Sequence, residues 1–141
     1  MEMQGKATVC EGQGRGSGVN AGRPVDLAHL ARYTLGNQSL EYEVLQLFHD
    51  RSDLLLQRLK AANEDKAWAD AAHAIKGSAR AVGAWHVANS AEYAEALRGK
   101  ERMAGSQGIL EDMERLIGEA KSYIASLLAE GGRDASAKAA F

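Results

Sequence analysis

The sequence predicts an all-α fold, namely an antiparallel four-helix bundle with a short additional helix at its N-terminal end. Through residues 25–130 apolar side chains recur at spacings of three, four and seven rather than in alternation, which is typical of amphipathic helices. The only proline, Pro24, precedes the first of these patterns and interrupts none of them. Four long amphipathic helices joined by short turns bury their apolar stripes most simply as a bundle.

Length and composition predict one folded domain between two tails. The 141 residues are enough for one domain of ordinary size but short for two. The segment from Gly5 to Gly22 is rich in glycine and nearly free of large apolar side chains, so we expect a flexible tail over residues 1–24. The bundle should occupy residues 25–130. Gly131-Gly132 should end the last helix and leave residues 131–141 as a second flexible tail.

Capping residues mark the first two helices. Asp26 suits the N-cap of a short helix that runs to about Leu35 and ends at Gly36-Asn37. A longer helix should begin near Ser39 and end before residues 63–65, which form the next break and N-cap region. The apolar face expected for this second helix consists of Leu40, Val44, Leu47, Phe48, Leu54, Leu55 and Leu59.

Three further helices are expected after that break. The third helix runs to a stop at Gly83, the fourth covers about residues 84–98, and a loop is expected over residues 99–108. The last helix should cover about residues 107–130. Its apolar stripe is the most continuous in the chain and consists of Leu110, Met113, Leu116, Ile117, Ala120, Ile124, Leu127 and Leu128.

Charge and residue spacing argue against several classes of function. The formal net charge of −2 is unlike the strongly basic balance of general nucleic-acid binders. No apolar run is long enough for a membrane span and the start does not resemble a secretory signal, so we expect a cytoplasmic protein. Cys10 is the only cysteine, and His29, His49 and His86 lack the paired spacing of metal ligands. We therefore expect no metal site, and no P-loop motif predicts ATP binding.

The residues that point to a function lie on the outer face of the third helix. Six apolar residues of this helix share one direction and should form its core stripe: Trp68, Ala71, Ala72, Ile75, Ala79 and Val82. At about 100° per residue, His73 lies about 140° from that direction and should face solvent. Its neighbours on the outer face are small or positively charged, namely Lys66, Ala69, Lys76, Gly77 and Arg80.

These neighbours favour a nucleophilic histidine that a partner can approach closely. Gly77 lies in mid-helix, where glycine costs roughly 1 kcal/mol relative to alanine, so close approach of another molecule is a reason for its presence. Lys76 and Arg80 would attract an anion toward the imidazole. A solvent-exposed imidazole is largely neutral at pH 7 and so keeps a nitrogen lone pair for attack.

One run of residues carries a family resemblance: His73-Ala74-Ile75-Lys76-Gly77-Ser78, followed by Gly83. It resembles the His-x-x-Lys-Gly-Ser signature of histidine phosphotransfer domains, and the predicted helices match their four-helix bundle over about residues 25–130. The resemblance implies that His73 is phosphorylated, that Lys76 helps to hold the phosphoryl group and that Gly77 gives a partner close access. The glycine-rich tail and the loop expected before the last helix depart from the simplest members.

The remaining residues of the motif receive subsidiary roles. We assign Arg80 to phosphoryl stabilisation together with Lys76, and Lys66 and Ala69 to partner docking together with Gly77. Ser78 turns toward the side of the core stripe and, like Gly83, is assigned a structural role.

The sequence therefore predicts a monomeric phosphocarrier rather than an enzyme. His73 would accept a phosphoryl group from, and donate it to, the aspartate of response-regulator receiver domains, with a hybrid sensor histidine kinase as a further partner. The chain would bind no cofactor, and the receiver would supply the magnesium ion. The alternative is a helical adaptor that binds a receiver or a kinase without transferring phosphate.

Overall fold

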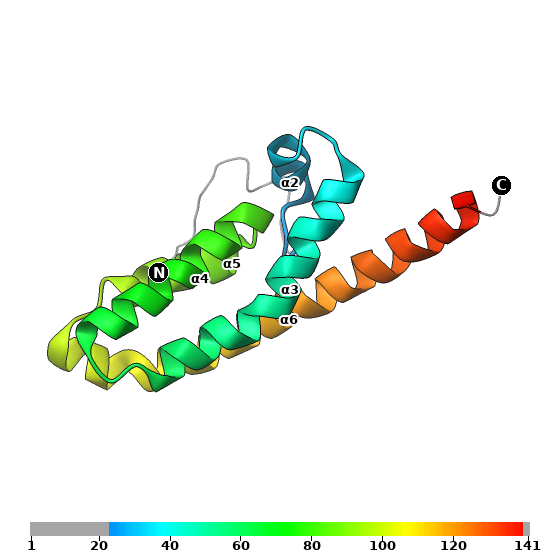
Figure 1. The fold of residues 1–141 in the computed structure, drawn as a ribbon. Coiled ribbons are helices and arrows are strands. Elements are labelled where there is room, and N and C mark those ends of the chain that lie inside the picture. Colours follow the sequence, from blue (N-terminus) through cyan, green and yellow to red (C-terminus); the bar gives the residue numbers. More distant parts are fainter. Residues whose placement is uncertain (1–22, 140–141) are drawn as a thin grey trace, which may run out of the picture.

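The computed structural model describes residues 23–139, and all their regular secondary structure is helical. The helices are α2 (Leu27–Tyr33), α3 (Gln38–Ala61), α4 (Asp65–Val82), α5 (Trp85–Glu95) and α6 (Gly99–Ala139) (Figure 1). The all-α fold class is confirmed. The tail expected over residues 1–24 falls almost wholly on residues 1–22, which lie outside the described residues.

The four long helices pack in a ring around one core. α4 packs against α3 and α5, and α6 packs against the other side of the same two helices, while short α2 contacts α4 and α3. Figure 1 shows α3 and α4 as the two arms of one helical hairpin, with α6 running along α3. The buried residues of α4 are the six predicted for its core stripe. Trp68 is 1% exposed, and its indole N–H donates to the backbone oxygen of Ala94 on α5 over 2.7 Å.

The end of α4 is tied to the start of α2. Gly83 ends α4 in the left-handed region (φ 76°), as predicted, and its backbone oxygen accepts a hydrogen bond of 2.9 Å from the N–H of Asp26. The Asp26 carboxylate caps α2 by accepting from the N–H of His29, and also accepts from the indole of Trp85. Burial alone would raise the pKa of Asp26, but these two hydrogen bonds and the nearby positive charge lower it.

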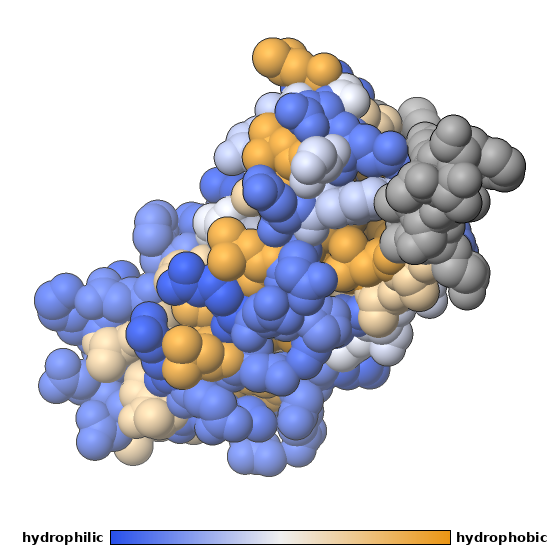
Figure 2. Space-filling model, turned by 45° about the vertical axis from the view of Figure 1, so that its right-hand side comes forward, coloured by the Kyte–Doolittle hydropathy of each residue, from blue (hydrophilic) through white to orange (hydrophobic). Residues whose placement is uncertain are grey.

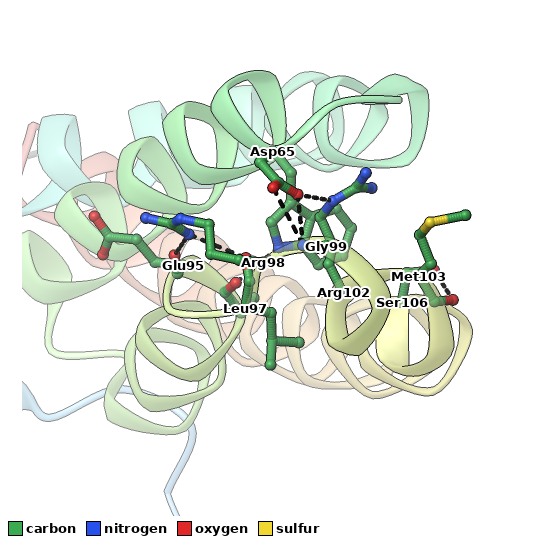
Figure 3. A network of polar contacts seen from close by, with 10 residues as sticks. Asp65, Glu95, Leu97, Arg98, Gly99, Arg102, Met103 and Ser106 are labelled. Carbon is green, nitrogen blue, oxygen red and sulfur yellow. Dashed lines mark hydrogen bonds and ion pairs between the residues drawn. The ribbon is translucent and has the colours of Figure 1, made fainter.

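The loop expected over residues 99–108 is wrong, because this segment forms the first turns of α6. The Asp65 carboxylate, at the start of α4, accepts hydrogen bonds of 3.0 and 3.1 Å from the N–H of Gly99 and one of 2.7 Å from Nε of Arg102 (Figure 3). A side chain from another helix thus satisfies a free N–H group of α6. Asp65 precedes Gly99 by 34 residues in the chain. The sequence around residue 99 therefore gives no sign that a helix begins there.

The last helix also continues past its predicted stop. α6 runs through Gly131-Gly132 to Ala139, so the expected helix end at these glycines is wrong. Each glycine costs roughly 1 kcal/mol relative to alanine but does not forbid helical geometry. Ala135, Ala137 and Ala139, which follow, have the highest helix propensity of any residue type.

The apolar face predicted for α3 is correct only in part. Leu40, Leu47 and Leu54 are 38%, 55% and 50% exposed, so their predicted burial is wrong. The buried residues of α3 are Leu45, Phe48, Ser52, Leu55, Leu56 and Leu59. This helix carries leucines on two neighbouring faces, and only one of these faces meets the core.

Candidate functional site

His73 lies in the middle of α4 and points away from the core. Its side chain is 68% exposed, while Ala72 and Ile75 beside it are buried. The same helical periodicity that buries the apolar stripe therefore places the imidazole in solvent, as predicted.

A carboxylate from α5 holds the imidazole and a lysine together. Oε2 of Glu95 lies 2.9 Å from Nδ1 of His73, and Oε1 lies 2.6 Å from Nζ of Lys76. The Lys76 side chain is only 16% exposed, so its stem is packed and its ammonium group is well positioned. The hydrogen bond from Lys76, followed by that from His73, lowers the pKa of Glu95. The carboxylate is therefore ionised at neutral pH.

This contact determines which nitrogen of His73 carries the proton. An ionised carboxylate only accepts hydrogen bonds, so Nδ1 must be the donor. In the neutral ring the lone pair then resides on Nε2. Within the described part of the chain, nothing forms a hydrogen bond to Nε2.

The surface beside the imidazole is open at Gly77. A Cβ atom built on Gly77 would meet nothing within 4 Å, so its absence relieves no crowding inside the chain. The missing side chain leaves room for another molecule one turn from His73.

The sequence model for the Hpt domain matches residues 43–129. The chain belongs to the Hpt domain family. Hpt domains are phosphocarriers rather than kinases and work with receiver domains and histidine kinases in phosphorelays. The matched region covers α4 and α5 completely, most of α3, and α6 from its start to residue 129. No match was found among curated proteins or among solved structures.

Two of the predicted basic residues of this Hpt domain lie apart from the cluster around Glu95. Arg80 is about 10 Å along the helix from His73, and its NH2 lies 3.7 Å from Oε1 of Glu92. Lys66, 81% exposed, lies 2.9 Å from Oδ2 of Asp70, and this contact raises its pKa. Of the two predicted phosphoryl-stabilising residues, only Lys76 is therefore brought to the imidazole.

The other predicted residues lie on the flanks or at the end of α4. Ala69 and Ser78 are half-buried. Gly83 is buried at the turn into α5, where a Cβ would lie 2.8 Å from Cβ of Asp26. Gly83 therefore allows the segment before α2 to pack closely against the end of α4, and it does not contact the imidazole.

Sequence reasoning missed Glu95, the residue that organises the site. A usable signal was present, because α4 and α5 form a tight hairpin around Gly83 and Ala84. Residues equally distant from such a turn lie side by side, and 73 and 95 are both eleven positions from 84. Pairing of the two helices on this basis would have placed Glu95 opposite the histidine.

The described residues add two observations about this Hpt domain. Among them, no helix is long and apolar enough to cross a membrane. In the same part of the chain no group of three or more histidine, cysteine or acidic side chains is arranged to hold a metal ion.

Proposed function

We propose that the chain is a phosphorelay carrier that accepts a phosphoryl group on Nε2 of His73 from the aspartate of a response-regulator receiver domain, and donates it to another receiver. One observation carries the proposal: the 2.9 Å contact between Nδ1 of His73 and Glu95. It commits the ring proton to Nδ1 and leaves Nε2 as an exposed nucleophile.

The transfer step requires no oxidant and no added proton. The Nε2 lone pair forms a bond to phosphorus while the bond from phosphorus to the receiver's aspartate oxygen breaks. The aspartate leaves as a carboxylate with the bonding electrons, and the proton stays on Nδ1. The phosphorylated ring gains positive charge, which the Glu95 carboxylate stabilises. Donation to the next receiver is the same step reversed.

Lys76 is expected to act on the phosphoryl group from its position beside Glu95. Its ammonium lies 2.6 Å from the carboxylate, and a phosphoryl group on His73 would offer it a second anionic partner. In this proposal the receiver supplies the magnesium ion and most of the stabilisation of the transition state.

The test is transfer of labelled phosphate from a phosphorylated receiver to the chain. We expect label on the chain that is acid-labile and base-stable, as phosphohistidine is, and none on His73→Gln. Because the His73 side chain is 68% exposed, the variant should melt at the temperature of the parent. Equal labelling of a folded His73→Gln protein would overturn the assignment. Receiver binding without any label on the parent would favour the adaptor alternative.

A further inference from the structure

Glu95 is the last residue of α5, and helices commonly fray at their ends. Its carboxylate is nevertheless the group that holds His73 and Lys76 together. α5 has no basic side chain in its last turn, and its C-cap, Ala96, is not in the left-handed region. On the face of the molecule in Figure 2, hydrophilic residues surround separate hydrophobic patches, and side chains on such a surface are held mainly by polar contacts. The position of Glu95 therefore depends on polar contacts from outside α5.

Two side chains donate to backbone oxygens at the end of α5. The indole of Trp68 on α4 donates to the oxygen of Ala94, directly before Glu95. NH1 of Arg98 donates to the backbone oxygen of Glu95 over 2.7 Å and to that of Leu97 over 3.0 Å (Figure 3). The Arg98 side chain is exposed, so these bonds bury little surface. Their effect is to fix the last carbonyl groups of the helix.

The segment after Glu95 is fastened to α4, the helix that carries His73. The Asp65 carboxylate accepts hydrogen bonds from the N–H of Gly99 and from Nε of Arg102, whose side chain is only 11% exposed. The bond from Arg102, followed by that from Gly99, lowers the pKa of Asp65. The carboxylate is therefore ionised at neutral pH and acts only as an acceptor. Gly99 is four positions after Glu95, so Glu95 has little freedom to slide along α4.

Both ends of the hairpin formed by α4 and α5 are thus fixed. The turn at Gly83 sets the pairing at one end, and the bond from Gly99 to Asp65 sets it at the other. If Glu95 moved away by about 1 Å, its 2.9 Å contact with Nδ1 of His73 would be lost. The neutral ring would then carry its proton on either nitrogen.

We propose that Asp65 and Arg98 are positioning residues for His73. They hold the end of α5, which keeps the Glu95 carboxylate on Nδ1 and leaves Nε2 free for attack. Neither side chain forms a hydrogen bond to the imidazole, and each acts through Glu95. For its chemical consequence this inference rests on the proposed function, to which it adds the contacts that maintain the geometry of the site.

The first measurement is the tautomer of His73 in the full chain, by nitrogen-15 NMR at about pH 8, where exposed imidazoles are neutral. In the parent we expect the proton mainly on Nδ1. Asp65→Ala and Arg98→Ala each remove one anchor, and each should increase the fraction of rings with the proton on Nε2. The double variant should show the largest increase. Arg98→Ala changes an exposed side chain, so this variant should fold even if Asp65→Ala is unstable.

Matched controls change similar side chains away from the site. Asp53→Ala removes a carboxylate that lies 2.6 Å from Nζ of Lys121 and joins α3 to α6. Arg115→Ala removes an exposed arginine of α6. Both controls should keep the tautomer of the parent. Asp65→Asn keeps an oxygen that accepts from Gly99 and should therefore also keep it.

The second measurement is the rate at which phosphoramidate labels His73. This donor is small and needs no protein surface, so the rate reports the imidazole and not the docking of a partner. We expect a loss of about two- to fivefold in the Asp65→Ala/Arg98→Ala double variant, because fewer rings have Nε2 free. In a Glu95→Ala chain, Asp65→Ala should change neither the tautomer nor the rate further, because it acts through the same carboxylate.

The outcomes keep the two proposals apart. A parent tautomer in both single variants and in the double variant would overturn the positioning role, and so would equal shifts in the controls. A further loss from Asp65→Ala in the Glu95→Ala chain would also overturn it. If no donor labels the parent, the proposed function fails, and the tautomer still decides whether Asp65 and Arg98 position Glu95.

Discussion

Lys76 and His73 share the carboxylate of Glu95, so neither side chain acts independently. The lysine was expected from the sequence to hold a phosphoryl group, yet its ammonium is already 2.6 Å from a carboxylate. In the proposed reaction, an incoming phosphoryl group would therefore have to compete with Glu95 for Lys76. The same carboxylate orients the imidazole, which makes Glu95 a positioning residue for the proposed reaction.

Glu95→Gln should slow phosphoryl transfer while receiver binding is retained. Glutamine can still accept a hydrogen bond from Nδ1, but it carries no negative charge to stabilise the phosphorylated ring. We expect a loss of about one order of magnitude in the transfer rate, which corresponds to about 1.4 kcal/mol in the barrier. Glu92→Gln is the control, because Glu92 pairs with Arg80 and does not contact His73. An unchanged rate for Glu95→Gln would remove Glu95 from the mechanism.

The stability that Glu95 contributes to the parent chain should depend on pH in a defined direction. Lys76 lowers the pKa of Glu95 in the folded chain, so the folded state holds a proton at this carboxyl less readily than the unfolded state does. The resulting stabilisation is present above the ordinary carboxyl pKa and is lost as the pH falls through the lowered value. Denaturation of the parent and of Glu95→Gln should therefore differ at pH 7 and converge in strong acid. A constant difference across that range would contradict the pairing.

At this scale the direction in which residues face along one helix was predicted from the sequence. Contacts between helices were not predicted, because they require the register of α4 against α5 about the Gly83 turn. The exposure of His73 and the openness at Gly77 follow from positions within α4 alone. The partners of Lys76 and Arg80 depend on the register between α4 and α5, which the Gly83 turn sets. Arg80 was grouped with His73 because both lie on one face, and the register instead gives it Glu92.

Among the helices, α6 buries a stripe of apolar residues that runs from Ile109 to Ile124. Ile117, 2% exposed, faces the bundle, whereas its neighbour Leu116 is half-buried. Ile117→Ala should destabilise the chain by about 2 to 5 kcal/mol, because it removes buried methyl groups and leaves a cavity. Leu116→Ala should cost less, since water reaches part of that side chain already. Chemical denaturation of both variants checks the order, and equal losses would mean that the two faces of α6 are wrongly assigned.

At the scale of helices, periodicity gave the fold class, whereas the ends and faces of α3 and α6 depended on the rest of the molecule. α6 begins at Gly99 because Asp65 of α4 accepts hydrogen bonds from Gly99 and Arg102. No residue close to Gly99 in the sequence indicates this cap. In α3 two leucine faces compete, and Leu45 and Leu56 reach the core instead of Leu47 and Leu54. Which face is buried is decided by the neighbouring helices.

For the molecule as a whole, the attachment of α2 depends on the turn between α4 and α5. His29 of α2 donates through Nε2 to the backbone oxygen of Arg80 over 2.9 Å, and its ring lies edge-on to Trp85 at 4.8 Å. These contacts, with those of Asp26, fasten the N-terminal helix to the end of α4.

Gly83→Ala should loosen this attachment. The residue has φ 76°, and a Cβ would lie 2.8 Å from Cβ of Asp26 and 3.0 Å from its backbone oxygen, so both the backbone and the contact become strained. We expect a loss of more than about 1 kcal/mol in unfolding free energy. Gly77→Ala is the control, because a Cβ there meets open space and should stabilise α4 by up to about 1 kcal/mol. A Gly83→Ala protein that melts at a higher temperature than Gly77→Ala would refute this account.

The helix that carries His73 is held at both ends, by Asp65 at its start and by the junction of Gly83 with Asp26 at its finish. In the proposed reaction, a helix anchored in this way would not need to rearrange when His73 gains or loses a phosphoryl group. Little conformational free energy would then be stored when the phosphoryl group binds to His73, and little would be released when it is transferred away. In the proposed function, the direction of net phosphoryl flow would then depend on the relative abundance and the acyl-phosphate chemistry of the two receivers, and the carrier would be reversible.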